Sequence, residues 1–124
     1  METFCTLLQV VIALGIFNVW FLRLNKPTNY RGGNATSMEE EFRVYGLSRY
    51  TMVGVGTGKV ILAFLLLVGL WSPTVVPAAS AGMAFLMAVA VALHFKVHDP
   101  VIKSLPAAAM LLMSITVLVL SRSS

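Results

Sequence analysis

The sequence has few charged residues and almost no cysteine. Only 11% of its 124 residues are charged, whereas soluble domains carry about 25%. Cys5 is the single cysteine, so one chain can form neither an internal disulfide nor a C-x-x-C thiol pair. The sequence also has no haem, flavin or iron–sulfur motif, so redox chemistry would require a partner that carries the cofactor. Because the chain has no thiol pair, a thioredoxin-like mechanism within one chain is excluded.

Hydrophobic residues, in contrast, make up 58% of the sequence, and the mean hydropathy is +0.87. They form four continuous runs, each near the roughly 20 residues that a helix needs to cross a bilayer. The runs do not alternate between polar and apolar residues, which favours helices over barrel strands. We therefore predict an all-α fold, a four-transmembrane-helix bundle that forms a single domain over residues 1–124. The expected spans are 4–24, 50–71, 75–97 and 104–121.

Pro106 leaves two possibilities for the last span. Proline inside a helix removes a backbone hydrogen bond and kinks the helix, whereas proline in the first turn is well tolerated. We favour the second possibility, in which the helix begins near residue 104.

The long connection between the first two runs contains a helix signal. Ser37 and Glu40 form a capping box, S-x-x-E, and Gly46 suits the position just after a helix end. We therefore expect a short amphipathic helix at residues 38–45. It would lie on the membrane surface or against the bundle.

The distribution of positive charge predicts the orientation in the membrane. All Lys and Arg residues except Lys59 and Arg122 lie in or beside the first and third connections. The positive-inside rule places these connections in the cytoplasm and both chain ends outside. We interpret the clusters as a topology signal of a multi-pass integral membrane protein and expect no nucleic-acid partner. Four aromatic residues are expected to anchor the protein at the interfaces: Trp20, Tyr30, Tyr50 and Trp71.

Lys59 is the most informative residue, because it stands alone near the middle of the second apolar run. An ammonium group at the centre of a bilayer costs at least about 2.5–3.5 kcal/mol, and such residues usually face a polar interior. Lys59 could bind an anionic or carbonyl group of a ligand, or take part in a proton relay. The alternative is a buried structural ion pair.

Three further residues are candidates for the same polar interior. His94 lies about one turn inside the charged end of the third run and can relay protons, although an interfacial structural histidine is equally consistent with its position. Glu41 is the expected anionic partner, in contact with Lys59 or with His94. Asn18 is polar within the first run and is expected to form hydrogen bonds across helices or to line a cavity.

Two other patterns receive less weight. His94 and His98 have a spacing that would place both rings on one helical face, but no accompanying ligand motif supports a metal site, and we predict none. Gly54 and Gly58 form a G-x-x-x-G pattern that lacks the spacing of a nucleotide loop. We expect it to pack against a stripe of small residues on the third run. The members of this stripe are Ala84, Ala88 and Ala92.

Several short motifs, in a fixed order along nearly the whole chain, resemble those of the DoxX-like family. They are Phe17-Asn18-Val19-Trp20, Tyr30-Arg31-Gly32-Gly33, Glu40-Glu41-Phe42-x-x-Tyr45-Gly46-Leu47, Gly58-Lys59, His94-Phe95-Lys96-Val97-x-Asp99-Pro100 and Ser104-Leu105-Pro106-Ala107. The resemblance implies a small four-helix membrane protein. It also implies that the recurrent polar residues of the family correspond here to Arg31, Glu41, Lys59 and His94.

The resemblance implies fold more than function. DoxX and DoxD proteins are membrane subunits of a thiosulfate:quinone oxidoreductase, other relatives are linked to oxidative stress, and an animal relative is a receptor chaperone. One hypothesis is therefore a redox-associated subunit that binds a quinone or a similar lipophilic ligand and works with a protein partner or as a homo-oligomer. The alternative is a non-enzymatic membrane chaperone or assembly partner with a structural polar cluster. A small transporter is a third possibility, although the chain lacks inverted halves.

Overall fold

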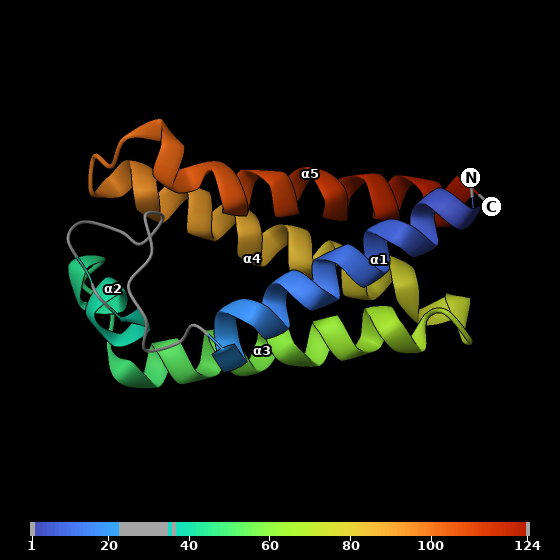
Figure 1. The fold of residues 1–124 in the computed structure, drawn as a ribbon, viewed down its shortest axis with the longest axis horizontal. Helices are drawn as coiled ribbons and strands as arrows, with labels where there is room; N and C mark the ends of the chain where they lie inside the picture. Colours follow the sequence, from blue (N-terminus) through green and yellow to red (C-terminus); the bar gives the residue numbers. More distant parts are fainter. Residues whose placement is uncertain (1, 23–34, 36, 124) are drawn as a thin grey trace.

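The computed structural model describes residues 2–22, 35 and 37–123, and the regular structure in this part of the chain is all helical. Four long helices form a bundle in which each contacts two neighbours, in the cyclic order α1, α3, α4, α5 (Figure 1). The prediction of an all-α bundle is therefore confirmed. The long helices are α1 (Glu2–Phe17), α3 (Arg49–Val68), α4 (Val76–Lys96) and α5 (Val101–Ser123).

Short helical segments connect and extend these four helices. α1 continues as a π-helix, η1 (Asn18–Leu22), and a 3₁₀ turn, η2 (Pro73–Val75), leads from α3 into α4. The short helix α2 (Met38–Val44) precedes α3. In Figure 1, α2 and the connection between α4 and α5 lie at one end of the bundle, and the start of α1 and the end of α5 lie at the other.

The four long helices are long and apolar enough to cross a membrane. Many large apolar side chains face outward from them, where lipid would cover them; Leu14 is 61% exposed and Phe85 is 68% exposed. Tyr50 and Trp71, just inside and just beyond the two ends of α3, are almost fully exposed, as expected of interface anchors. The candidate spans are Thr3–Phe21, Arg49–Val68, Pro73–Lys96 and Val101–Ser121.

The short helix α2 forms as the sequence predicts. The Ser37 hydroxyl accepts a hydrogen bond from the Glu40 backbone N–H, at an N–O distance of 3.2 Å. After the helix, Gly46 has a φ of +80°, which glycine adopts without steric cost. The Leu47 N–H then donates to the Phe42 carbonyl at 2.8 Å, which completes a Schellman motif.

The expected start of the last helix near residue 104 is wrong. α5 begins at Val101, and Pro106 lies inside it. Because Pro106 is in the second turn, it removes only the one hydrogen bond that would run back to the first turn. The Ser104 hydroxyl donates to the Val101 carbonyl at 2.8 Å, so the first turn keeps a bond of its own.

The expected packing of Gly54 and Gly58 against an alanine stripe is also wrong. Nothing lies within 4 Å of the position that a Cβ atom on Gly54 would take, and Ala88 and Ala92 are exposed. A different glycine of the same helix, Gly56, lies directly against the ring of Trp20. The most extensive helix packing is between α4 and α5, which follow each other in the chain, rather than between α3 and α4.

The core is densely packed in the half of the bundle near the start of α1. Residues from all four helices are fully buried there: Ile12, Ala63, Leu66, Ser80, Met83 and Val117. The Gln9 side-chain amide donates to the Leu66 carbonyl at 2.8 Å, so a polar contact also joins α1 to α3. We call this region the packed half.

Candidate functional site

A cavity of about 840 Å³ occupies the other half of the bundle, at the end where α2 lies. All five α-helices and η1 contribute to its walls. Most of the lining is apolar, and four methionines provide flexible surface: Met38, Met87, Met110 and Met113. We call this region the hollow half.

Four of the five residues predicted for a polar interior line this one cavity. Asn18 reaches it from η1, Glu41 from α2, Lys59 from α3 and His94 from α4. Arg31, the fifth, lies outside the described residues. Side chains that are far apart in the sequence are thus brought together around one apolar space.

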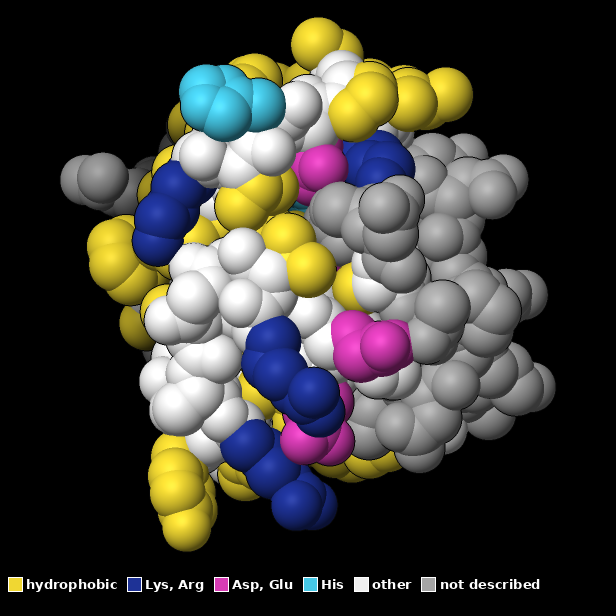
Figure 2. Space-filling model, turned by 90° about the vertical axis from the view of Figure 1, so that its left-hand side faces the viewer, with side chains coloured by type: hydrophobic (Ala, Val, Ile, Leu, Met, Phe, Trp, Pro, Cys, Tyr) yellow, Lys and Arg dark blue, Asp and Glu magenta, His cyan; other side chains and the backbone are white. Residues whose placement is uncertain are grey.

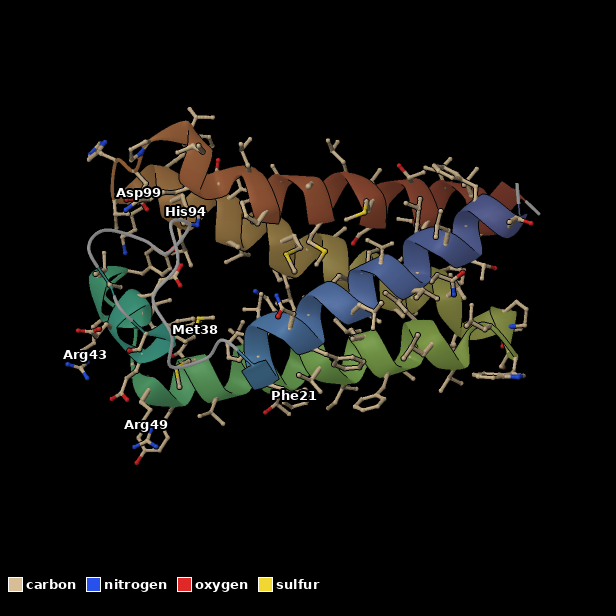
Figure 3. All side chains as sticks on the ribbon, in the orientation of Figure 1. Phe21, Met38, Arg43, Arg49, His94 and Asp99 are labelled. Atoms are coloured by element: carbon tan, nitrogen blue, oxygen red, sulfur yellow. The ribbon has the colours of Figure 1, made fainter. Side chains whose placement is uncertain are left out.

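His94 owes its position to the turn that ends α4. His98 has a φ of 58°, and the Asp99 N–H donates back to the His94 carbonyl at 3.0 Å, which makes a second Schellman motif. This turn folds Asp99 over the end of the helix. Its Oδ2 atom lies 2.8 Å from Nδ1 of His94, and the side chains of the two residues are only 4% and 7% exposed (Figure 3).

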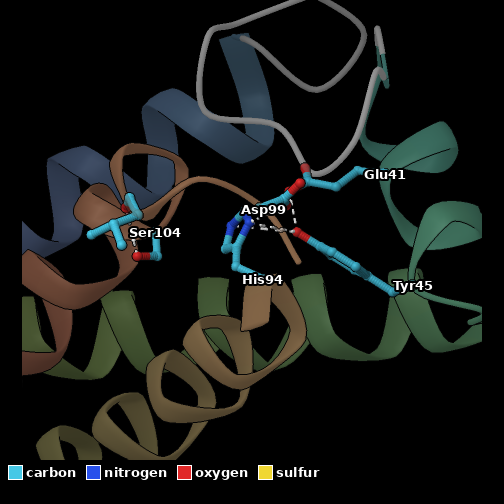
Figure 4. Close-up of polar contacts among 6 residues, drawn as sticks. Glu41, Tyr45, His94, Asp99 and Ser104 are labelled. Atoms are coloured by element: carbon cyan, nitrogen blue, oxygen red, sulfur yellow. Dashed lines mark hydrogen bonds and ion pairs between the residues drawn. The ribbon is translucent and has the colours of Figure 1, made fainter. Parts of the chain in front are cut away.

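A second pair comes from α2. Glu41 and Tyr45 are one turn apart on the same face, and the Tyr45 hydroxyl donates to Glu41 Oε1 at 2.7 Å. The same hydroxyl oxygen lies 3.5 Å from Nδ1 and 3.4 Å from Nε2 of His94, where the two rings cross at 83° (Figure 4). Glu41, Tyr45, His94 and Asp99 thus form a continuous buried group, which we call the polar cluster.

A further bond holds α2 onto α4 beside the polar cluster. The Lys96 ammonium donates to the Tyr45 backbone carbonyl at 3.0 Å. Arg43 and Arg49 instead point away from the bundle (Figure 3), and Arg43 forms an exposed ion pair with Glu39 at 3.1 Å. Figure 2 shows how Lys, Arg, Asp, Glu and His side chains gather on this end of the molecule.

Lys59 faces the cavity from the middle of α3. Its Nζ atom lies 5.7 Å from the centre of the Trp20 ring, within the range of a cation–π interaction. It forms no direct hydrogen bond or ion pair with another described residue, although Glu41 acts on it electrostatically. In place of the expected direct contact of Glu41 with Lys59 or with His94, the Tyr45 hydroxyl lies between Glu41 and His94 and bridges them.

The expectation that Trp20 anchors the protein at the membrane interface is wrong. Its side chain is only 9% exposed, lines the cavity and packs on Gly56. It also lines a smaller hollow of about 310 Å³ together with residues of α3. The indole therefore forms a wall between the cavity and this hollow. Trp20 lies within the π-helix η1, and π-helical turns are frequent at functional sites.

Two members of the polar cluster are not among the residues predicted from the sequence. Tyr45 lies four residues after Glu41, and this spacing on a helix could have indicated that the two side chains meet. Asp99 gave no such indication, because an aspartate before a proline is common where a helix ends. The spacing of His94 and His98 does not lead to a shared face, because α4 ends at Lys96 and His98 turns away at the surface.

Four membrane-length helices around a mostly apolar cavity with a few polar groups define a multi-pass integral membrane protein of the small helical-bundle class. The chain belongs to the DoxX-like family, whose sequence profile matches residues 7–118. Among curated proteins and among solved structures, none matches the chain.

Proposed function

We propose that this protein binds a small lipophilic ligand with oxygen functions inside the hollow half, and that quinone-like compounds are its ligand class. The observation that carries the proposal is the convergence of Asn18, Lys59 and three members of the polar cluster on one apolar cavity. A volume of about 840 Å³ is within the range of roughly 300–1,000 Å³ that is typical of small-molecule sites. Apolar walls with a few placed polar groups are the usual form of such sites.

The residues present fit a ligand of this class. The Lys59 ammonium and the Asn18 amide can donate hydrogen bonds to a carbonyl oxygen, and the methionine-rich walls suit an apolar ring. Lys59 is the main reason to favour a ligand over a purely structural role. Its charge lies at a depth that costs at least about 2.5–3.5 kcal/mol, and no ion pair within the described residues offsets that cost.

We further propose a redox-associated role in which a protein partner, or a second copy of the chain, supplies the electron-transfer cofactor. In the orientation we propose, the end that carries α2 and the connection between α4 and α5 faces the cytoplasm, as the positive-inside rule requires. The cavity would then lie on the cytoplasmic side of the bilayer midplane. The polar cluster would lie between the cavity and the aqueous phase.

The test is ligand binding by the full chain in lipid nanodiscs, measured by native mass spectrometry and by titration with decylubiquinone. The variant Lys59→Met removes the buried charge, and Arg49→Met is the matched control, because it removes an exposed charge from the start of the same helix. We expect wild type and Arg49→Met to bind the quinone equally, and Lys59→Met to bind it at least about tenfold more weakly with an unchanged unfolding temperature.

A second variant covers the case in which Lys59→Met fails to fold. Ala90→Phe places a ring in the cavity from the wall of α4 and leaves every polar group in place. It should also prevent quinone binding. The proposal is wrong if the quinone does not bind wild type, or if it binds both variants as tightly as wild type.

A further inference from the structure

The bond between His94 and Asp99 determines which nitrogen of the imidazole carries the proton. An ionised carboxylate can only accept a hydrogen bond, so Nδ1 of His94 must donate across the 2.8 Å to Asp99 Oδ2. In the neutral imidazole, Nε2 then keeps its lone pair. This arrangement, in which a buried carboxylate orients an imidazole, is the one that prepares histidine to act as a base.

Among the described residues, His94 links Asp99 to the cavity. His94 lines the cavity and Asp99 does not, although both side chains are buried. The backbone turn that places Asp99 is built with His98 in the left-handed region, a conformation that costs a non-glycine residue roughly 1–2 kcal/mol. Asp99 is thus a positioning residue whose geometry the fold maintains against local strain.

The surroundings of His94 are arranged to receive a proton. Tyr45 donates its own proton to Glu41 at 2.7 Å, and its hydroxyl oxygen lies 3.4 Å from Nε2 of His94. Asp99, 2.8 Å from Nδ1, neutralises the imidazolium that forms when Nε2 takes a proton. Within the described residues, the charged groups that line the cavity with His94 are Glu41 from α2, Lys59 from α3 and Lys103 from α5, and Lys96 and Asp99 lie beside the polar cluster.

We infer that His94 is a general base and that the ligand of the cavity has a weakly acidic hydroxyl, as in a phenol or the reduced form of a quinone. The inference rests on the proposed function and names the substrate class of the same site. In the step, the O–H bond of the ligand breaks, the proton joins Nε2 of His94, and the electron pair stays on the ligand oxygen. The Lys59 ammonium in the cavity stabilises the oxyanion, and no electron changes hands.

The experiment uses a probe whose colour reports its ionisation, 4-nitrophenol with an alkyl tail, bound to the full chain in nanodiscs. At a pH at which the free probe is mostly protonated, we expect wild type to raise the phenolate fraction of the bound probe at least about fivefold. Asp99→Asn keeps a hydrogen-bond acceptor near Nδ1 but removes the charge, and it should abolish this rise while the probe still binds. His94→Gln should do the same, and His98→Asn is the matched control that should behave as wild type, because asparagine removes the exposed histidine and still adopts the left-handed conformation of the turn.

A measurement without ligand protects the test against misfolding of a variant. The ¹⁵N shifts of the His94 imidazole in wild-type protein should show the Nδ1–H form. An Nε2–H form, or a bound probe that stays protonated in wild type, would overturn the inference. If quinone binds but the phenol does not, only this inference fails; if neither binds, the proposed function fails with it.

Discussion

The packed half and the hollow half of the bundle are built from the same four long helices, yet they use them in opposite ways. In the packed half, side chains such as Leu66, Met83 and Val117 have no exposed surface at all. In the hollow half, the helices stand around about 840 Å³ of space, and α2 adds polar groups to its walls. The difference indicates that close packing and the cavity with its polar groups lie at different ends of each helix.

The physical reason lies in the forces that hold helices together in lipid. Lipid tails are as apolar as the side chains, so helices associate through close packing and hydrogen bonds rather than through the hydrophobic effect. A cavity forfeits that packing, and the lost contacts must be offset elsewhere in the bundle. The packed half and the bond from Gln9 to the Leu66 carbonyl offset this loss.

Truncation of one leucine in each half should reveal the difference between them most clearly. Leu66→Ala removes a fully buried side chain and should lower the free energy of unfolding by about 2–5 kcal/mol. Leu86→Ala makes the same chemical change in the cavity wall, where little packing is lost, and should cost less than about 1 kcal/mol. Reversible unfolding in mixed detergent micelles measures both. Equal losses would mean that the two halves do not differ in their packing.

A smaller effect is expected at the boundary between the cavity and the outer hollow. A methyl group on Gly56 would overlap the Trp20 ring, so Gly56→Ala should cost about 1–3 kcal/mol or displace the indole. Gly54→Ala, two residues earlier on the same helix, meets open space and should instead stabilise α3 by about 0.5–1 kcal/mol. Unfolding, together with Trp20 fluorescence in a Trp71→Phe background, measures both variants. A fluorescence change in Gly54→Ala but not in Gly56→Ala would contradict the packing of Trp20 on Gly56.

The smallest effects concern the two turns beside the hollow half. Gly46→Ala forces alanine to a φ of +80° and should cost about 1–2 kcal/mol. At the end of α4, His98 already holds a left-handed φ of 58°, and His98→Gly removes the steric cost of its side chain. This variant should stabilise the protein by up to about 1 kcal/mol and leave quinone binding unchanged. The same unfolding assay tests the pair. A loss of stability in His98→Gly would show that its side chain, rather than its backbone, matters to the turn.

Much of the fold and of the polar interior could be predicted from the sequence. The membrane cost of a lone charge draws attention to Lys59, and Asn18, Glu41 and His94 join it because polar groups in or beside apolar runs need an interior. All four line one cavity. Local signals are sufficient for α2 as well, since capping and the C-terminal glycine depend on residues that are neighbours in the sequence.

The remainder depends on geometry that local patterns do not contain. Asp99 reaches His94 because a residue just after the end of α4 takes the left-handed conformation. That residue is His98, so the glycine that usually signals such a turn is missing from the sequence. Trp20 looks like an interface anchor by its place near the end of an apolar run, and the π-helix that turns it inward has no simple sequence signature. Proline is common at helix starts, so the sequence predicts Pro106 near the start of the last helix. α5 instead begins five residues earlier, at Val101, where it packs on α4.

The π-helix at Asn18–Leu22 makes the length of this segment critical in a way that its composition does not show. A π turn holds about one residue more than an α turn, and each residue rotates an α-helix by roughly 100°. Deletion of Phe17 would let α1 continue through this segment as a regular helix, and Trp20 would rotate about the helix axis by roughly 40°, because a π turn advances only about 80° per residue. The indole would shift against Gly56 and the cavity without any change to the side chains of the segment itself, so insertions and deletions here should be tolerated less well than substitutions.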